Sequence, residues 1–524
     1  MRILLAEPLA PGGLNLLRSQ EGWEVIASNP KEYLQHIADA DALIVRSGLI
    51  VDAAVLAKAP KLRVIGRAGV GIENVDLPAA TAAGILVMNT PGGNAVSVAE
   101  HTLALMLSMA RSIPAACVST KTGKWEKRKF VGTELRGKTL GVVGLGSVGR
   151  EVVRRAAAFE MRIIANDPYV NSQTAKSVGV ELVDLPTLYA ESDYITLHTA
   201  LTPESNRMLS REAFAKMKTG ARVLNCARGE LIDQEALAEA LRSGKLAGAA
   251  LDVFEHEPPA SGEPLLQIDT LVATPHIGGA TEEAQETVAI RLAQQIVDYL
   301  RTGIALNAVN LPALTPEQYK TLSPYSQLAQ RLGSFASYIA KGNPKTVRLV
   351  YFGKLAELNT HLVRNAGIAG ILQRSLARNA NSVNAMQIAA DRGLTIAERH
   401  DQRAARTDTI LLELETDAGQ TAVEGAVLLD RPRLVQVDGI QCEAPLEGNL
   451  TFVENADVPG VIGFIGDALG KNAINIATFS LGRKKAGDDA IAVVQTDQPV
   501  PDSVLAELRK NRAIKRASSV KFSD

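Results

Sequence analysis

The sequence predicts an α/β fold with parallel sheets, and three features of its pattern support this. Short apolar runs alternate with helical stretches of ten or more residues up to roughly residue 280, which is typical of βαβ units. A glycine-rich turn, Gly144 to Gly149, lies between an apolar run and a helical one. From about Gly448 the strands and helices follow a different order, so we expect a separate, smaller C-terminal domain.

The first elements are short and apolar. Arg2 to Ala6 is expected to form a buried strand, and Pro11 to Leu17 opens a short helix. Ala42 to Arg46 is expected to be the second strand and Leu62 to Gly66 the third. Because the alternation continues well beyond these strands, we expect two Rossmann-like, doubly wound parallel-sheet domains in this part of the chain.

Length and composition indicate an ordinary globular protein. The 524 residues correspond to three or four domains at about 150 residues each. A formal net charge of -1 gives no basic field for nucleic acid. No run reaches the 18 apolar residues that a membrane span needs, and Glu7 and Pro8 interrupt the apolar start before any cleavage-like site. We therefore expect neither a nucleic-acid partner nor a membrane.

The cysteines are few and scattered. Their odd number argues against a disulfide framework and against a cysteine-based metal site, and favours a reducing compartment, which we expect to be the cytoplasm. They are Cys117, Cys226 and Cys442. No metal site is expected.

The segment after Val309 differs from the one before it. Pro312, Pro316 and Pro324 punctuate it, and glycine-flanked strands and alanine-rich helical runs follow to about residue 440. These features predict an intervening α/β domain, and it carries no catalytic pattern.

The C-terminal stretch has a βαββαβ order, which is the ferredoxin-like arrangement. In its first helix, Val461, Ile462, Ile465 and Leu469 recur at helical spacing. The expected elements are, in order, the strand Leu450 to Glu454, the helix Pro459 to Gly470, the strands Ala473 to Leu481 and Asp489 to Thr496, the helix Asp502 to Lys510 and the strand Ile514 to Lys521. Asp457 is expected to cap the first helix, with Pro459 in its first turn.

The glycine-rich turn has the context of a dinucleotide-binding loop. An apolar strand precedes it and the helical stretch Ser147 to Phe159 follows it. Gly144 allows the tight turn, Gly146 allows close approach of a pyrophosphate, and Gly149 allows close packing of the helix on the strand. The helix N-terminus supplies amide donors to the phosphates.

A second strand, Arg162 to Ala165, leads to Asp167, which lies 23 residues after Gly144. This spacing is near the usual value of about 20. The carboxylate can accept hydrogen bonds from both ribose hydroxyls and would repel a 2′-phosphate, so NAD is favoured over NADP. The alternative interpretation is a glycine-rich turn followed by a solvated aspartate.

Three polar residues downstream suit the oxidation of an alcohol. Arg228 and His276 each follow an apolar strand, and Glu257 lies in a loop between them. Ligands bind at the carboxyl ends of strands in such sheets. A histidine, with a pKa of about 6.5, can take the alcohol proton; a carboxylate orients the ring, and an arginine binds a carboxylate with two parallel donors. Each of these residues taken alone could have a structural role. Their order along the chain after the nucleotide loop favours the interpretation that they act together in catalysis.

These residues resemble those of the D-isomer-specific 2-hydroxyacid dehydrogenases, over roughly residues 40 to 310. The matching runs are Arg67 to Asp76, Asn89 to Asn94, Ser97 to Glu100, Gly144 to Gly149, Cys226 to Gly229, Ala250 to Pro258 and Thr274 to Gly278. The resemblance implies that His276 is the base, Glu257 its partner and Arg228 the carboxylate anchor. It also implies that Asp252 holds the nicotinamide amide.

The implied cofactor-binding residues are Val70, Gly144, Gly146, Ser147, Val148, Gly149, Asp167, Thr199, Cys226, Ala227, Arg228, Asp252, His276, Gly278 and Gly279. Residues 1–97 plus 285–308 would form a substrate-binding lid, 98–284 the NAD-binding domain, 309–445 the intervening domain and 446–524 a regulatory domain of the ACT type. The active site would lie in the cleft between the first two.

Within this family, the two-part extension is similar to that of long members that oxidise 3-phospho-D-glycerate to 3-phosphohydroxypyruvate, the first step of phosphorylated L-serine biosynthesis. The run Gly123 to Phe130 is also similar to theirs. A phosphorylated substrate needs cations, and the implied substrate-binding residues are Arg46, Ser47, Gly69 and Arg128, with Lys127 and Lys129 as further candidates. The alternative for the basic run is a solvated turn.

Two other functions remain open: a related dehydrogenase for a D-2-hydroxy acid or hydroxypyruvate, and a catalytically silent NAD-sensing interaction protein. The resemblance also implies a homodimer or homotetramer. Paired ACT modules would bind L-serine as an allosteric effector at their seam, through Asn455, Asp457 and Asn475.

Overall fold

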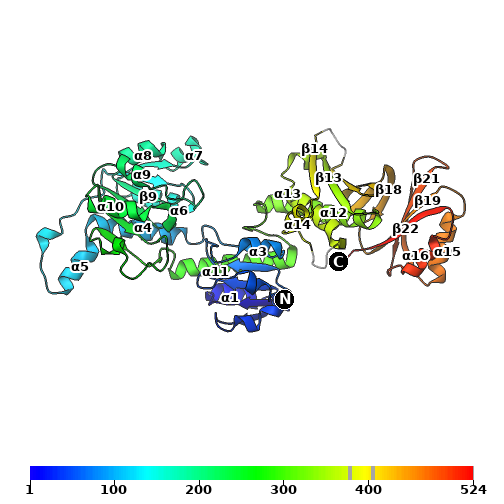
Figure 1. Ribbon diagram of the computed structural model, residues 1–524, viewed down its shortest axis with the longest axis horizontal. Coiled ribbons are helices and arrows are strands. Elements are labelled where there is room, and N and C mark those ends of the chain that lie inside the picture. The colour runs from blue at the N-terminus through cyan, green and yellow to red at the C-terminus, as the bar shows by residue number, and fades with distance from the viewer. Residues whose placement is uncertain (376–379, 403–406, 523–524) are drawn as a thin grey trace. The chain divides into compact units, whose positions relative to one another are not determined.

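The computed structural model describes residues 1–375, 380–402 and 407–522 (Figure 1). The chain divides into two compact units. One comprises Leu9–Leu16 and Thr90–Arg291, and the other comprises Met1–Pro8, Leu17–Asn89 and Leu292–Asp524. Four sheets lie in these units, and together they confirm the predicted fold class: two parallel sheets, an intervening α/β part and a ferredoxin-like C-terminal part.

The first unit is built on a seven-stranded parallel sheet in the order β12-β11-β10-β9-β6-β7-β8. The strands are β6 (Thr139–Val143), β7 (Arg162–Asn166), β8 (Glu181–Leu182), β9 (Tyr194–Leu197), β10 (Ala221–Asn225), β11 (Leu246–Leu251) and β12 (Leu271–Ala273). The order reverses between β6 and β9, and ligands bind at such a switch point in doubly wound sheets.

Helices cover both faces of this sheet, and a buried apolar cluster fills each side. On one face lie α8 (Leu185–Glu191), α9 (Arg211–Lys216) and α10 (Gln234–Arg242), and on the other lie α4 (Ala95–Ala110), α6 (Ser147–Ala157) and α7 (Ser172–Ser177). Because helices cover both faces of the sheet, we expect ligands to bind at the carboxyl edge of its strands. The segment that includes α5 (Ile113–Lys121) extends away from the body of this unit (Figure 1).

The second unit begins with a five-stranded parallel sheet in the order β2-β1-β3-β4-β5. Its strands are β1 (Arg2–Leu5), β2 (Glu24–Ala27), β3 (Ala42–Val45), β4 (Val64–Arg67) and β5 (Leu86–Met88), with helices α2 (Ala53–Leu56) and α3 (Leu77–Ala82). The expectation that Ala42 starts the second strand was wrong, because β2 precedes it. This edge strand is short and half-exposed, so its apolar pattern is weak.

Residues after α11 (Glu282–Thr302) form the intervening part. Its mixed sheet has the order β14-β13-β15-β16-β17-β18. The elements are α12 (Pro316–Ile339), β13 (Pro344–Phe352), α13 (His361–Leu372), α14 (Ala385–Asp391), β14 (Thr395–Asp401), β15 (Thr409–Thr416), β16 (Gly419–Leu428), β17 (Arg431–Val437) and β18 (Ile440–Pro445). Pro316 starts α12, behind a capping box formed by Thr315 and Gln318, whereas Pro324 lies inside the helix.

The C-terminal part is a four-stranded antiparallel sheet in the order β20-β21-β19-β22, which is the ferredoxin-like order. Its elements are β19 (Asn449–Ala456), α15 (Val461–Lys471), β20 (Ile476–Arg483), β21 (Asp489–Thr496), α16 (Asp502–Leu508) and β22 (Ile514–Lys521). The third expected element starts three residues late, because Ala473 adopts a left-handed φ of 56° and still belongs to the turn.

The expectation that Asp457 caps α15 was wrong. The helix begins at Val461 with Gly460 as its N-cap, at a φ of 92°, and it has no side-chain cap. Pro459 therefore precedes the helix. The carboxylate of Asp457 accepts hydrogen bonds from the Arg483 guanidinium at 2.8 Å and from the Gly487 backbone N–H at 2.9 Å. An arginine on β20, which is separated from β19 by β21, binds this carboxylate, and the pattern of a single turn does not reveal it.

No single helix in the described ranges is long and apolar enough to cross a bilayer. Only α4 and α5 taken together reach that length and composition, and they are bent by 64° at their junction.

Candidate active site

The loop between β6 and α6 has the shape of a phosphate-binding turn. Gly144 has a φ of 95°, and a Cβ there would lie 2.5 Å from the backbone oxygen of His198. A Cβ on Gly149 would lie 2.0 Å from the backbone oxygen of Gly144, so only glycine allows this packing. Around Gly146 no atom lies within 4 Å of the Cβ position, and the helix start has no side-chain cap. Open space beside uncapped amides fits the pyrophosphate of a dinucleotide.

Asp167 follows β7 directly and faces this loop. Its carboxylate accepts the backbone N–H of Leu145 at 2.8 Å and that of Tyr169 at 2.9 Å. A carboxylate offers about four acceptor positions, so two bonds leave capacity for hydroxyl donors. The role of Asp167 in binding a ribose remains a prediction.

The turn that carries Arg228 is held in place by the side chain of Asn225. The amide of Asn225, fully buried at the end of β10, accepts the N–H of Ala227 at 3.0 Å and donates to the carbonyl of Arg228 at 2.8 Å. A Cβ on Gly229 would lie 2.0 Å from the backbone of Phe254, so this turn packs directly against the next loop. Arg228 and the loop leading to Glu257 therefore hold each other in place.

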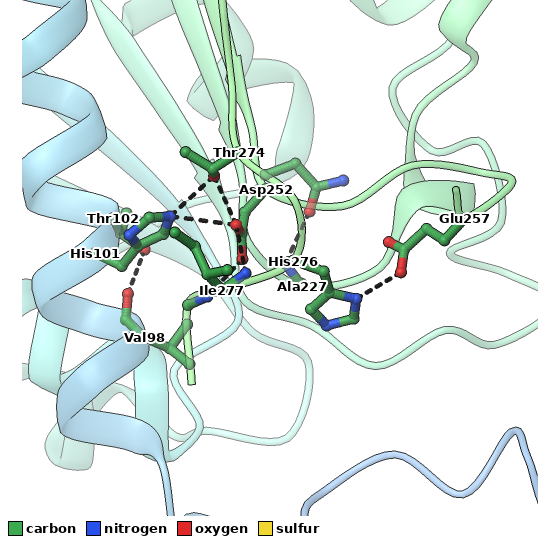
Figure 2. Close-up of polar contacts among 11 residues, drawn as sticks. Val98, His101, Thr102, Ala227, Asp252, Glu257, Thr274, His276 and Ile277 are labelled. Atoms are coloured by element: carbon green, nitrogen blue, oxygen red, sulfur yellow. Dashed lines mark hydrogen bonds and ion pairs between the residues drawn. The ribbon is translucent and has the colours of Figure 1, made fainter. Parts of the chain in front are cut away.

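Glu257 and His276 form a hydrogen-bonded pair, with 2.6 Å between Oε2 and Nδ1 (Figure 2). The other carboxylate oxygen of Glu257 accepts the N–H of Phe254 at 3.0 Å, which holds the carboxylate in its own loop. An ionised carboxylate only accepts, so Nδ1 carries the proton and the neutral ring has its lone pair on Nε2. The His276 side chain is 54% exposed, so this nitrogen can reach a ligand.

His276 has a left-handed φ of 53°, which is rare for a residue other than glycine. The surrounding contacts come from Asp252, which follows β11 and is 1% exposed. Its backbone oxygen accepts the N–H of His276 at 2.8 Å. Its carboxylate accepts the N–H groups of Ile277 and Gly278 at 2.9 and 2.8 Å and the hydroxyl of Thr274 at 2.6 Å. One aspartate thus fixes the segment on which the histidine lies.

Two other side chains at this edge have shifted pKa values. Burial raises the pKa of the Cys226 thiol to about 12, so it remains a neutral thiol. Burial lowers the pKa of His198 to about 3, and its Nε2 lies 2.9 Å from the Thr196 hydroxyl. Neither group suits proton transfer near neutrality. Thr199 follows His198 at the end of β9, where the resemblance places the cofactor cleft.

The implied substrate-binding residues are divided between the two units. Arg46, Ser47 and Gly69 follow strands β3 and β4, where the Arg46 N–H donates to the Glu7 carboxylate at 2.6 Å. Val70, implied in cofactor binding, belongs to the same unit. Arg128 lies in the other unit on a 3₁₀ turn, Lys127–Lys129, and is exposed. The role of all these residues in substrate binding remains a prediction.

The three expected effector residues do not gather at one point of the C-terminal sheet. Asn455 pairs with Ala490, and Arg483 pairs with the same residue from the other side, so Asn455 and Asp457 lie at that end. Asn475 precedes β20 at the opposite end and donates to the Asp497 carboxylate at 2.8 Å. The Gly487 N–H and then the Arg483 guanidinium lower the pKa of Asp457.

Two residues that the sequence analysis missed complete the network around Asp252. His101, on α4, directs Nε2 to the Asp252 carboxylate at 3.2 Å and to the Thr274 hydroxyl at 3.0 Å (Figure 2). A signal was present: His101 and Glu100 are the ionisable residues in an otherwise apolar helix. Thr274 is the first residue of the run Thr274 to Gly278 that resembles the family. Its hydrogen bonds to Asp252 and His101 are visible only in the structure.

Comparisons with known proteins agree with this geometry. The family model for the D-isomer specific 2-hydroxyacid dehydrogenase, NAD binding domain, matches residues 103–278. The model for the D-3-phosphoglycerate dehydrogenase intervening domain matches residues 321–438. The fold, the nucleotide loop and the first match define an NAD-dependent 2-hydroxyacid dehydrogenase.

Relatives narrow this class. D-3-phosphoglycerate dehydrogenase of Methanocaldococcus jannaschii is 42% identical over 98% of both chains. The crystal structure of the TT0316 protein from Thermus thermophilus is 38% identical, with a TM-score of 0.54, and covers 59% of this chain and 100% of its own. The crystal structure of D-lactate dehydrogenase from Aquifex aeolicus with NAD and lactic acid is 26% identical, with a TM-score of 0.52, and covers 60% of this chain and 100% of its own. The chain belongs to the D-3-phosphoglycerate dehydrogenase family.

Proposed function

We propose that this protein oxidises 3-phospho-D-glycerate to 3-phosphohydroxypyruvate with NAD, the entry to phosphorylated L-serine biosynthesis. The observation that carries the proposal is the pair of His276 and Glu257, 2.6 Å apart in the unit whose parallel sheet also carries the dinucleotide loop. Full-length similarity to a D-3-phosphoglycerate dehydrogenase supports the choice of substrate.

In this proposal His276 acts as the base. Its Nε2 lone pair takes the proton of the substrate hydroxyl, and the Glu257 carboxylate stabilises the imidazolium that forms. Arg228 binds the substrate carboxylate, and Asn225 holds the turn that presents it. When bound, NAD would accept the hydride from the substrate carbon that carries this hydroxyl group.

A steady-state assay separates this proposal from its alternatives. Turnover of 3-phosphoglycerate well above that of D-glycerate or D-lactate is expected, with NAD preferred over NADP because Asp167 would repel a 2′-phosphate. Turnover of the unphosphorylated acids alone would indicate a related dehydrogenase. Calorimetric binding of NAD without any turnover would indicate a silent NAD-sensing protein.

The substrate phosphate needs cations, and we assign this role to Arg46 and to the run Lys127, Arg128 and Lys129. The run is exposed, Lys127 and Lys129 lie near the rings of Trp125 and Phe130, and neither lysine forms an ion pair with a carboxylate of the described residues. Cations that are not neutralised locally are suited to a phosphate group. Arg128→Ala should therefore raise the Michaelis constant for 3-phosphoglycerate more than that for NAD.

We infer a homo-oligomer, in which the extended segment from α5 to Val131 contacts a second copy. Four of its apolar side chains are largely exposed: Ile113 at 50%, Val118 at 63%, Trp125 at 77% and Val131 at 83%. Exposed apolar groups gathered on one extended segment are typical of an interface. Sedimentation of the full chain should give a dimer or tetramer, and a monomer would contradict this inference.

We further propose that L-serine binds between two C-terminal modules. Asn455 is 4% exposed, and its side-chain oxygen has no hydrogen-bond partner among the described residues. Strand β20 lies at the edge of the sheet and its eight residues span roughly 25 Å. Antiparallel pairing of two β20 edges would bring Asn475 of one copy beside Asp457 of the other, so the three residues need two copies to form one site.

A cytoplasmic location fits the cysteines. All three are free in the structure, and Cys117 is exposed, which favours a reducing compartment.

A further inference from the structure

His101 lies outside the substrate and cofactor roles assigned above, yet it contacts the group that fixes the base. Residues Thr274 to Gly278 form the segment that carries His276. Apart from Pro275, each residue of this segment donates a hydrogen bond to Asp252, through a side chain or a backbone N–H. Asp252 and the segment therefore form one assembly.

That assembly is tied to the body of the unit by His101. Among the donors to the Asp252 carboxylate found in the described residues, three belong to the segment itself, and His101 comes from helix α4. The helix is long and buried along one side, so its position is set by the sheet. The imidazole also packs against the segment: its Cδ2 would be 3.7 Å from a Cβ on Gly278.

The protonation of the ring follows from its neighbours. The Thr274 hydroxyl lies 2.6 Å from Asp252 and donates its proton there, so its oxygen can only accept from His101. The carboxylate also only accepts. Nε2 of His101 therefore carries a proton and donates to both oxygens, which lie 3.0 and 3.2 Å away.

We propose that His101 is a positioning residue, whose Nε2–H holds Asp252 and, through it, the segment that places His276 against the substrate. The left-handed φ of His276 persists because four hydrogen bonds to Asp252 determine the path of the backbone. Without His101 the segment keeps its internal bonds but loses its attachment to α4. The base is then less well placed, and a misplacement of about 1 Å costs about a hundredfold in rate.

Three variants of the full-length enzyme test this role. His101→Gln places an amide N–H near the position of Nε2, whereas His101→Asn is one methylene shorter and cannot reach Asp252. His101→Leu removes the donor while filling the space. Ser192→Ala is the matched control, because it also removes one buried hydrogen bond in the same unit, a 2.6 Å bond to Leu188, away from the segment.

The first readout is hydrogen–deuterium exchange of the 274–278 segment. We expect faster exchange in the Leu and Asn variants, and exchange at the wild-type level in the Gln variant and in Ser192→Ala. The second readout is kcat, which should fall about ten- to a hundredfold in the Leu and Asn variants and recover in the Gln variant. Unchanged exchange in His101→Leu, or equal behaviour of the Gln and Asn variants, would overturn the proposal.

The inference rests on His276 being the base, and the two readouts separate the possible failures. Faster exchange with an unchanged kcat would mean that His101 holds the segment but that His276 is not the base. In that case the assignment of His276 under the proposed function fails, and the role of His101 in placing a base fails with it. Unchanged exchange leaves the base assignment standing and rejects His101 alone.

Discussion

Two turns that follow β-strands, one after β12 and one after β19, satisfy their polar groups in different ways. In the first, residues 274–278, the backbone N–H groups of residues 276–278 and the Thr274 hydroxyl donate to Asp252, and the His276 ring bonds to Glu257. In the second, Asp457 bonds to Arg483 and Gly487, but just before it, near the end of β19, the buried side-chain oxygen of Asn455 has no partner in the described part of the chain.

The difference indicates what each region needs to function. A polar network that is complete within one chain holds its groups in a fixed arrangement before any ligand arrives, which lowers the cost of reaching the transition state. A buried acceptor without a partner costs about 1 to 3 kcal/mol and is compensated only when a donor arrives. We therefore interpret the first turn as preorganised for catalysis, and the second as a site whose buried acceptor needs a donor from a ligand.

The largest expected effect is that of His276→Ala. The variant loses general-base help, which is worth roughly 10² to 10⁴ in rate, while the glycine loop and Asp167 remain to bind NAD. The measurement is kcat beside calorimetric titration with NAD. Turnover at the wild-type level would reject His276 as the base.

Glu257→Gln should have a smaller effect. The hydrogen bond to a charged partner that it weakens contributes about 1.5 to 3 kcal/mol, so kcat should fall roughly ten- to a hundredfold. Glu255→Gln is the matched control: it lies in the same loop but pairs with Arg207 at 2.6 Å. If both variants lose activity equally, the loss comes from the loop rather than from the histidine.

The sequence predicted the contacts of the turn that carries His276 better than those of the turn that carries Asp457, for a physical reason. Gly144, Arg228, Glu257 and His276 follow strands of one parallel sheet, and the carboxyl ends of such strands meet at one edge. Order along the chain therefore predicts proximity. In contrast, Arg483, which binds Asp457, is 26 residues away on β20, a strand separated from β19 by β21, so the turn pattern alone predicted a helix cap that does not form.

His101 was missed for a related reason. It lies on a helix, 151 residues before Asp252, and no spacing rule connects a helix position to the end of a distant strand. Strand β2 was missed because edge strands with one exposed face carry a weak apolar signal. Four strands of the C-terminal module were found because its sheet is covered by helices on one face, which keeps the alternation regular.

The proposed effector site at the turn that carries Asp457 can be tested with L-serine. Typical coupling of about 1 to 3 kcal/mol would reduce turnover roughly five- to 150-fold at saturation. Asp457→Ala and Asn475→Ala should abolish calorimetric binding and inhibition while leaving uninhibited turnover intact. Asn472→Ala is the control, because its side-chain amide donates to the Ala468 carbonyl of α15, the helix that Asn472 directly follows. Absence of both heat and inhibition in the wild type would mean that the turn binds another partner.

The smallest effect concerns acid stability and compares the two aspartates directly. Burial alone would raise the pKa of Asp252, but hydrogen bonds from His101, Thr274 and two backbone amides outweigh it, so the pKa is lowered. The pKa of the partly exposed Asp457 is lowered as well, by the Gly487 N–H and then by Arg483. Both carboxylates therefore stay ionised in the folded chain at a pH where an unfolded chain would protonate them.

A lowered pKa makes stability fall on acidification. The contribution of each carboxylate is complete above its ordinary pKa of 3.8 and is lost as the pH falls through the lower folded value. Calorimetry from pH 7 to 3 should show Asp252→Asn lowering the Tm of the transition that NAD raises, with a difference from wild type that shrinks below about pH 4. Asp457→Asn should lower a separate transition, and by less, because solvent screens an exposed pair. A difference that stays constant down to pH 3 for Asp252→Asn would show that its carboxylate is not held by the network that places His276.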